Sequence, residues 1–326
     1  MLKSTELTRR APSWKSVLAS AMLLALLAAP HAVLAGEGGV SHILPGANAT
    51  IVDLPPTKPG GFVKPMYLYY SGKVSAFIPT AAGLASNADA NVNTVAFGGG
   101  YTFEQTVLGG AHYTVAAFLP YTWVDISANV QTPGGPVYRQ NSVSGFGDLT
   151  VVPVMLAWKT GDWQFDFLMP IYAPIGSYKL GRLGNTGLNY WTFDPMAGVS
   201  DMNQKVGFNV MLHAGYAMNT ENPDTDYHSG SLFHFDGAIQ QLLPVGSGFL
   251  SLGAEGFYFN QLTCDSGEGA TLGCFKGMTA GVGPVLGYVL PMGKQALSVE
   301  LKWLPEIDTK KRLKGDYVWF KVVYKF

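Results

Sequence analysis

The sequence predicts an all-β fold, an antiparallel transmembrane β-barrel of about 12 strands, and three observations predict it. The 326-residue chain is 48% hydrophobic but only 13% charged, whereas soluble globular proteins carry about 25% charged residues. After residue 35, apolar residues alternate with polar ones and never form the run of ~20 that a membrane-spanning helix needs. The connections between alternating runs are short at one end and long at the other, as in outer-membrane barrels.

The first 35 residues differ from the rest and are expected to be a cleaved signal peptide. Basic residues at the start precede an apolar core, residues 17–29, and Val33-Leu34-Ala35 forms a small-residue cleavage site. We therefore expect export through the periplasm and insertion into the outer membrane. An uncleaved N-terminal anchor is the alternative.

The barrel is expected over residues 66–326, after an irregular Gly- and Pro-rich segment, residues 36–65, which could lie inside the lumen. From residue 66 onward the chain repeats one pattern, in which a run of alternating residues is followed by a turn. The runs cover residues 66–78, 93–104, 109–129, 143–159, 162–173, 189–202, 205–218, 231–243, 248–261, 276–290, 295–304 and 314–326.

The lengths of the connections alternate strictly along the chain. The short ones lie at residues 104–108, 160–161, 203–204, 244–247 and 291–294. The long ones lie at residues 79–92, 130–142, 174–188, 219–230, 262–275 and 305–313. Because outer-membrane barrels have short periplasmic turns and long outer loops, we expect the long connections outside the cell and both termini in the periplasm.

Alternation within the runs separates an apolar face from a polar one. In residues 295–304, for example, Val299 and Leu301 alternate with Glu300 and Lys302. Lipid penalises an exposed charge by about 2–4 kcal/mol near the midplane, so the polar face is expected to line the lumen. The candidate lumen-lining residues are Asp148, Asp166, His213, His234, Asp236, Glu255, Glu300, Lys302 and Lys321.

These lumen candidates allow two interpretations. They could form a polar pathway for a small solute, or they could be the ion pairs that any narrow lumen needs. Four of them are expected to form one charged layer across the lumen: Glu255, Glu300, Lys302 and Lys321.

Two long connections carry further candidates. Glu221, Asp224 and Asp226 could hold a calcium ion or another hard cation, but a solvated outer loop rich in Asx turns is the preferred account. Cys264 and Cys274 are the only cysteines, and in an exported protein we expect them to form a disulfide, with two free thiols as the alternative. No His lies near them, so no metal site is predicted, and no motif indicates a cofactor.

A set of short motifs occurs in order along the chain. They are residues 145–150 (GFGDLT), 172–178 (YAPIGSY), 189–195 (NYWTFDP), 219–230 (NTENPDTDYHSG) and 315–320 (GDYVWF). Through these motifs the chain resembles the meta-pathway of phenol degradation family over residues 66–326. The resemblance implies a Gram-negative outer-membrane barrel with transport activity, linked to the catabolism of aromatic compounds.

The expected function is an outer-membrane channel or transporter for small compounds, with hydrophobic aromatic solutes as the first candidates. Its expected partners are the lipid bilayer, a small solute and, through the terminal Phe326, the barrel-assembly machinery. A formal net charge of −1 lacks the basic surplus of nucleic-acid-binding proteins. A structural or lipid-binding barrel without transport is the alternative.

An enzyme is not expected, and a lipid hydrolase is the one enzymatic alternative. A lipid hydrolase could use His228 or His234 with Ser229, but a serine nucleophile needs a base within hydrogen-bond reach and a third orienting group. Adjacent residues on a strand point to opposite faces, so His228 cannot easily serve Ser229. No paired catalytic carboxylates are present.

Overall fold

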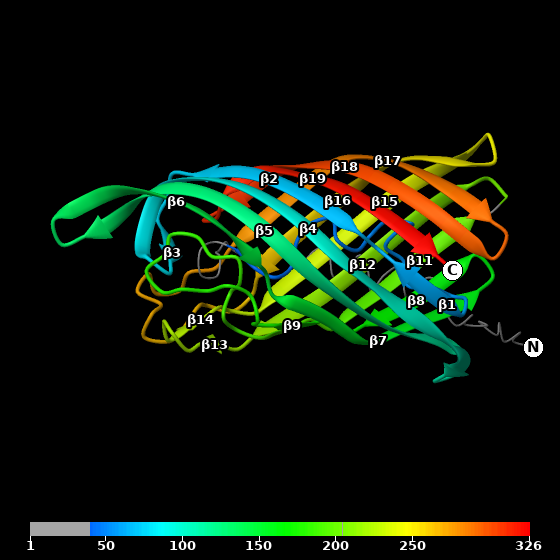
Figure 1. The fold of residues 1–326 in the computed structure, drawn as a ribbon, viewed down its shortest axis with the longest axis horizontal. Coiled ribbons are helices and arrows are strands. Elements are labelled where there is room, and N and C mark those ends of the chain that lie inside the picture. Colours follow the sequence, from blue (N-terminus) through cyan, green and yellow to red (C-terminus); the bar gives the residue numbers. More distant parts are fainter. Residues whose placement is uncertain (1–39, 204) are drawn as a thin grey trace, which may run out of the picture. The chain divides into compact units, whose positions relative to one another are not determined.

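The computed structural model describes residues 40–203 and 205–326, and its strands form an antiparallel ring (Figure 1). Hydrogen bonds join each strand to the next and the last back to the first, which confirms the predicted fold class. Each predicted run coincides with one position in this ring. In order the strands are β2 (Met66–Val74), β4 (Gly83–Val107), β5 (Ala111–Thr132), β7 (Leu149–Thr160), β8 (Trp163–Leu168), β11 (Met196–Asn203), β12 (Phe208–Asn219), β15 (Leu232–Val245), β16 (Gly248–Gln261), β17 (Met278–Met292), β18 (Gln295–Lys310) and β19 (Lys314–Lys325).

The other strands extend the ring or lie in its loops. They are β1 (Gly60–Val63), β3 (Ile78–Thr80), β6 (Gly135–Phe146), β9 (Ile171–Ala173), β10 (Thr192–Phe193), β13 (Glu221–Asn222) and β14 (Tyr227–His228). No helix in the described part of the chain is long and apolar enough to cross a membrane. The expected signal peptide, residues 1–35, lies outside the described residues.

Burial alternates along the strands as the polarity pattern predicts. On β18, Glu300 and Lys302 are buried, whereas Leu301 and Trp303 between and beside them are 46% and 51% exposed. On β19 the buried Lys321 likewise follows the exposed Phe320. The outer face of the ring is therefore apolar, and its charged side chains point inward.

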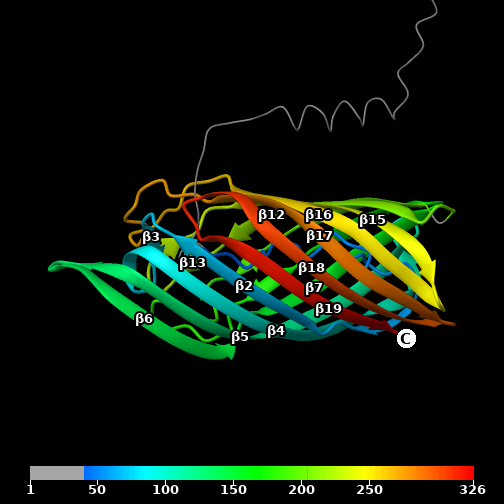
Figure 2. The same ribbon diagram turned by 90° about the horizontal axis from the view of Figure 1, so that it is seen from above.

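The two ends of the ring differ, as Figure 2 shows. At one end lie tight turns in which Gly161, Gly246 and Gly293 adopt positive φ values of 59°, 61° and 69°. Glycine meets no steric penalty in that conformation, and it allows strands to reverse within two residues. Phe326 lies at this short-turn end, because Lys325 pairs with Ala296 next to the turn before β18.

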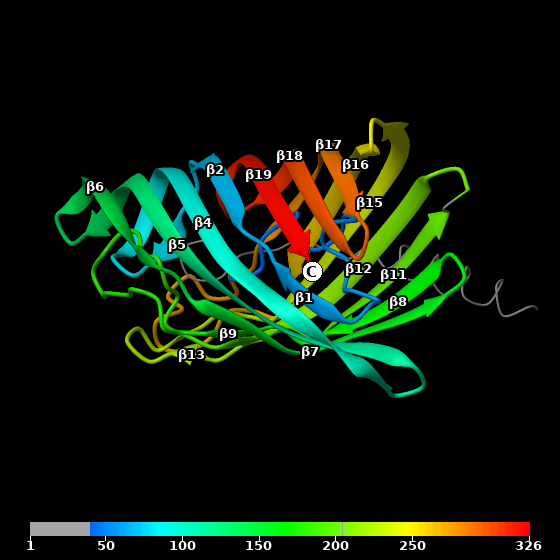
Figure 3. The same cartoon turned by 45° about the vertical axis from the view of Figure 1, so that its right-hand side comes forward.

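The prediction of long loops is wrong in part at three connections. Strands occupy much of residues 79–92, 130–142 and 305–313. There β4, β5, β6 and β18 continue past the ring toward the long-loop end. Figure 3 shows the β5–β6 hairpin as the farthest projection at that end. On these extensions of β4 and β5 the apolar side chains, such as Ala90 and Val124, face inward and polar ones, such as Asp89 and Asp125, face outward. This is the reverse of the lipid-facing pattern, so these residues do not read as membrane strands although the pairing continues.

The wall is interrupted beside β6. Among the strands that the structure describes, β6 pairs with β5 alone, and Gly147 and Asp148 separate it from β7. The loop over residues 174–191 covers part of that edge: Ser177 donates its backbone N–H to the Phe146 carbonyl at 3.0 Å. Gly176 permits this approach, because a Cβ there would lie 2.7 Å from the Gly147 carbonyl carbon.

Residues 40–59, which we call the plug, run through the lumen. Val40 and Ser41 lie beside Asn219 and Gln261 at the long-loop end, and the Pro55 carbonyl accepts a hydrogen bond from Gln164 near the short-turn end. The chain then enters the wall as β1, which pairs with β4 and β19, so the barrel begins at Gly60 instead of Met66. The first described residues thus lie at the opposite end from Phe326, although both termini were expected together.

Candidate functional site

A single carboxylate on the plug binds three lysines of the wall region. Asp53 lies 2.6 Å from the Nζ of Lys64, 3.0 Å from that of Lys302 and 2.7 Å from that of Lys321. The Asp53 side chain is 1% exposed. Because an unpaired charge in such an interior is costly, this contact fixes the middle of the plug against β18 and β19.

The expected charged layer surrounds this contact. Lys302 lies 2.7 Å from Glu255 and 3.2 Å from Glu300. Thr50 of the plug donates a hydrogen bond to Glu300 at 2.9 Å. We use the name charged layer for Asp53, Glu255, Glu300, Lys302 and Lys321.

The remaining lumen candidates form smaller buried pairs. The Nε2 of His234 lies 2.8 Å from Asp194, and Asp236 accepts the Gly46 backbone N–H of the plug at 3.1 Å. His213 faces Asp166 at 3.6 Å. These side chains therefore hold strands and plug together.

Asp148 occupies the interruption in the wall. Its carboxylate accepts backbone N–H groups of Gly176 at 2.8 Å and Leu188 at 2.7 Å, and it lies 2.8 Å from the Nε2 of His42 on the plug. The His42 ring stacks on Tyr172, with centroids 5.0 Å apart. The motifs at residues 145–150 and 172–178 thus meet at one place, where they join wall, loop and plug.

A cavity of about 420 Å³ lies beside the plug, against the opposite side of the lumen. We call this side, formed by the inward faces of β2, β4, β5 and β7, the apolar wall. It contributes Leu68, Val92, Val124, Ile126 and Val152 to the lining. The cavity reaches from Leu183 and Arg312 in the long-loop region to Phe62 and Lys325 near the short turns.

Of the nine lumen candidates, only Asp148 lines this cavity. The other eight are buried among strands and plug, with exposures of 4% or less. The geometry therefore does not support a polar pathway through the charged layer. The plug covers the four strand residues of the charged layer, whereas its own Asp53, paired with Lys64, also borders the cavity along the apolar wall.

The loop candidates have separate places. Glu221, Asp224 and Asp226 are exposed in and around the β13–β14 hairpin, and Asp224 donates its backbone N–H to the Asn222 side chain at 3.1 Å. Within residues 40–203 and 205–326, no group of three His, Cys, Asp or Glu side chains could hold a metal ion. The acidic loop is therefore a local turn structure.

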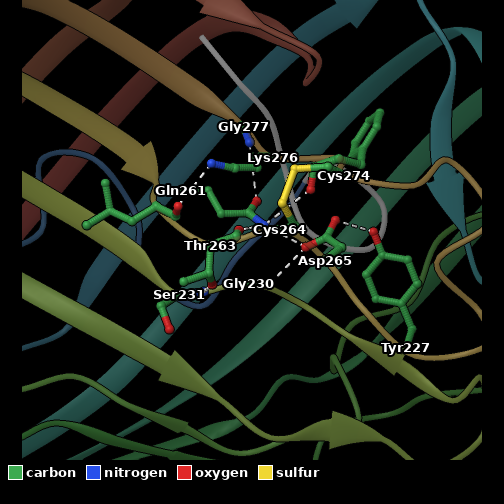
Figure 4. Close-up of a disulfide and its surroundings, with 12 residues drawn as sticks. Tyr227, Gly230, Ser231, Gln261, Thr263, Cys264, Asp265, Cys274, Lys276 and Gly277 are labelled. Carbon is green, nitrogen blue, oxygen red and sulfur yellow. Dashed lines mark hydrogen bonds between the residues drawn. A yellow bond between two sulfur atoms is a disulfide. The ribbon is translucent and has the colours of Figure 1, made fainter. Parts of the chain in front are cut away.

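Cys264 and Cys274 form a disulfide with an S–S distance of 2.02 Å (Figure 4). Next to it, Asp265 accepts hydrogen bonds from Gln261 at 2.6 Å, from the Gly230 backbone at 2.8 Å and from the Tyr227 hydroxyl. Burial raises the pKa of Asp265 to about 6. Phe275, directly after the bridge, packs into the apolar cluster that includes Val124 and Leu183.

The structure does not assemble the hydrolase arrangement of His228 or His234 with Ser229. The His228 Nε2 lies 2.8 Å from the Asn219 carbonyl oxygen, and its Nδ1 lies 3.4 Å from the Ser266 hydroxyl. His234 is committed to Asp194. Neither His is therefore directed at Ser229.

Sequence reasoning missed three residues of this site: His42, Asp53 and Arg312. His42 and Asp53 lie in a segment without periodicity, so no face could be assigned to them. Asp53 is nevertheless the only acidic residue between Glu37 and Asp89. An isolated carboxylate before a barrel that carries inward lysines is a signal that could have suggested the contact.

A closed ring with an apolar exterior and a charged interior defines an outer-membrane β-barrel. The chain belongs to the family described as "Putative MetA-pathway of phenol degradation", whose model matches residues 73–322.

Solved structures resemble this chain to different degrees. An outer membrane channel from Pseudomonas putida F1 superposes with a TM-score of 0.62 at 15% identity, over 87% of this chain and 100% of that one. The β-domain of the Bordetella autotransporter BrkA gives a TM-score of 0.44 at 12% identity, over 82% and 99%. The monoaromatic hydrocarbon channel CymD gives 0.40 at 9%, over 82% and 88%. A search of curated protein sequences gives no match.

Proposed function

We propose that this protein is an outer-membrane channel that carries small apolar solutes, aromatic ones among them, along the apolar wall of its lumen. The observation that carries this proposal is the cavity of about 420 Å³ between that wall and the plug. Apolar lining with a few polar groups is typical of sites for small hydrophobic molecules. The family's link to phenol degradation and the channel from P. putida F1 support the same function.

The geometry favours an apolar solute over an ion. The charged layer is paired internally and covered by the plug, so it offers no row of free charges to a passing ion. Along the apolar wall, a polar solute would lose its hydration without replacement, whereas an apolar one gains from leaving water.

Uptake by intact cells tests the proposal. Cells that express the protein are compared with cells that lack it, using radiolabelled toluene as the apolar probe and a sugar of similar size as the polar one. We expect faster uptake of toluene alone. Equal rates with and without the protein would contradict a channel, and faster uptake of the sugar alone would contradict the apolar route.

We also propose that residues 1–35 are removed during export and that Phe326 presents the barrel to the assembly machinery. Phe326 is 57% exposed, and its backbone pairs with Gly61 at the short-turn end. Sequencing of the mature N-terminus should begin at Gly36. Phe326→Ala should lower the amount of barrel in the outer membrane, whereas Phe97→Ala, at another exposed outer position, should lower it less.

A further inference from the structure

Arg312, in the turn between β18 and β19, is a buried cation whose Nε has no hydrogen-bond partner among the described residues. Its side chain is 10% exposed. Its Nη2 donates to the Tyr317 hydroxyl at 3.2 Å. A guanidinium has five N–H donors, and a buried donor without a partner is costly, so such a group requires an explanation.

The nearby carboxylate does not use these donors. Glu306 lies 4.0 Å from the Arg312 Nε, which is too long for a hydrogen bond. Its oxygens instead accept hydrogen bonds from Thr279 at 2.8 Å, from Tyr70 at 3.1 Å and from the Gly315 backbone at 2.7 Å. Glu306 thus balances the charge of Arg312 without accepting a hydrogen bond from its Nε.

Arg312 also lies where a solute would pass. It lines the cavity along the apolar wall, and it lines a small second hollow near Asn219 and Gly230 at the long-loop end. Val40, Ser41 and Tyr190 are the other residues that border both spaces. The guanidinium therefore lies between the mouth of the lumen and its apolar interior.

We propose that Arg312 is the hydrogen-bond donor of a binding site for ring compounds that carry one oxygen acceptor, a phenol hydroxyl or a carboxylate. The oxygen accepts from the Nη N–H groups that Tyr317 does not use, while the ring lies against Val124, Ile126 and Leu183. A solute without that oxygen fills the same cavity but leaves Arg312 unpartnered. This inference rests on the proposed function and narrows its substrate class.

Binding to the purified full-length barrel in detergent tests the site. The probes are 4-ethylphenol, 4-ethylbenzoate and ethylbenzene, titrated by calorimetry with empty micelles as the blank. We expect the two oxygenated probes to bind at least about tenfold more tightly than ethylbenzene, because one hydrogen bond from a charged donor supports such a ratio. Arg312→Met should remove this preference and leave the affinity for ethylbenzene unchanged.

Matched variants keep the result interpretable. Lys310→Met removes an exposed cation nearby and should change nothing. If Arg312→Met leaves Glu306 uncompensated and the barrel unfolds on a gel, the double variant Arg312→Met/Glu306→Gln removes both charges and should show the same loss of preference.

Two failures are distinguishable. Binding of all three probes with equal affinity, or a preference that survives in Arg312→Met, would overturn the Arg312 site while the apolar channel stands. Binding of none of the probes by the wild-type protein would overturn both proposals.

Discussion

Asp53 is the residue whose loss should release the plug. Asp53→Asn removes the charge shared by Lys64, Lys302 and Lys321 and leaves buried cations uncompensated. We expect the barrel to lose about 3 kcal/mol of stability, since breaking one side of a buried ion pair has such a cost. Heat-modifiable gel migration measures the loss, and conductance in planar bilayers should rise as the plug loosens.

Asp308→Asn is the control for this variant. Its pair with Lys310 is exposed, so we expect little change in either readout. If Asp53→Asn behaved like Asp308→Asn, the plug would be held by its other contacts and Asp53 would not be its main attachment.

Single residues also show where prediction from sequence reaches its limit. Glu300 and Lys302 could be placed inside because each lies between lipid-facing neighbours on a strand. That same pattern could not show that Asp53, 249 residues away from Lys302, covers them. A contact between a strand and a segment without periodicity leaves no pattern in either one.

Among the elements, the disulfide loop should be locally stabilised and independent of the barrel. Reduction of Cys264–Cys274 should cost the loop ~2–3 kcal/mol, because the short ring no longer limits its unfolded state. The ladder of β16 and β17 does not include the bridge, so the barrel should stay folded. Proteolysis at Lys276 after reduction, with intact migration of the remaining barrel, is the expected result.

The non-reduced protein supplies the control. Mass spectrometry should find no alkylatable thiol in it before reduction. Collapse of the heat-modifiable form on reduction alone would show that the loop supports the barrel, contrary to this account.

The same loop should become less stable as pH rises from about 4 to 6. Burial raises the pKa of Asp265 to about 6, whereas an unfolded Asp has a pKa of about 3.9. In that range the folded loop binds more protons than the unfolded one, so its stability falls with rising pH and then stays constant above 6. Hydrogen exchange of residues 227–230, corrected for the intrinsic effect of pH, measures the change.

Asp265→Asn keeps the shape and removes the titration. Its loop should show no change in stability across this pH range. An equal pH response in the variant would assign the effect to another group.

Strands were easier to predict than the segments that join them. The ring positions followed from the alternation, and the short turns followed from the short connections between the alternating runs. The β5–β6 hairpin did not, because its β5 arm turns apolar residues inward and polar ones outward, the reverse of the lipid-facing pattern, and most of β6 is exposed. The interruption at Asp148 is also invisible in a sequence, since it depends on how β6 ends against the loop over residues 174–191.

For the whole molecule, the orientation in the membrane follows from the two unlike ends. Gly134→Cys, at the tip of the β5–β6 hairpin, should react with a membrane-impermeant maleimide on intact cells. Lys294→Cys, in the turn between β17 and β18, should react only after the outer membrane is permeabilised. The reverse labelling would place the long loops in the periplasm.

The central claim is that solute passes along the apolar wall and not through the charged layer. Uptake of radiolabelled toluene by intact cells tests it most directly, with Val92→Trp narrowing the cavity and Glu300→Gln altering the charged layer. Phe97→Trp, at a 65% exposed position on the outer face of the same strand, is the control. We expect a severalfold drop in uptake for Val92→Trp and wild-type uptake per folded barrel for the other two variants. Normal uptake in Val92→Trp together with a loss in Glu300→Gln would contradict it.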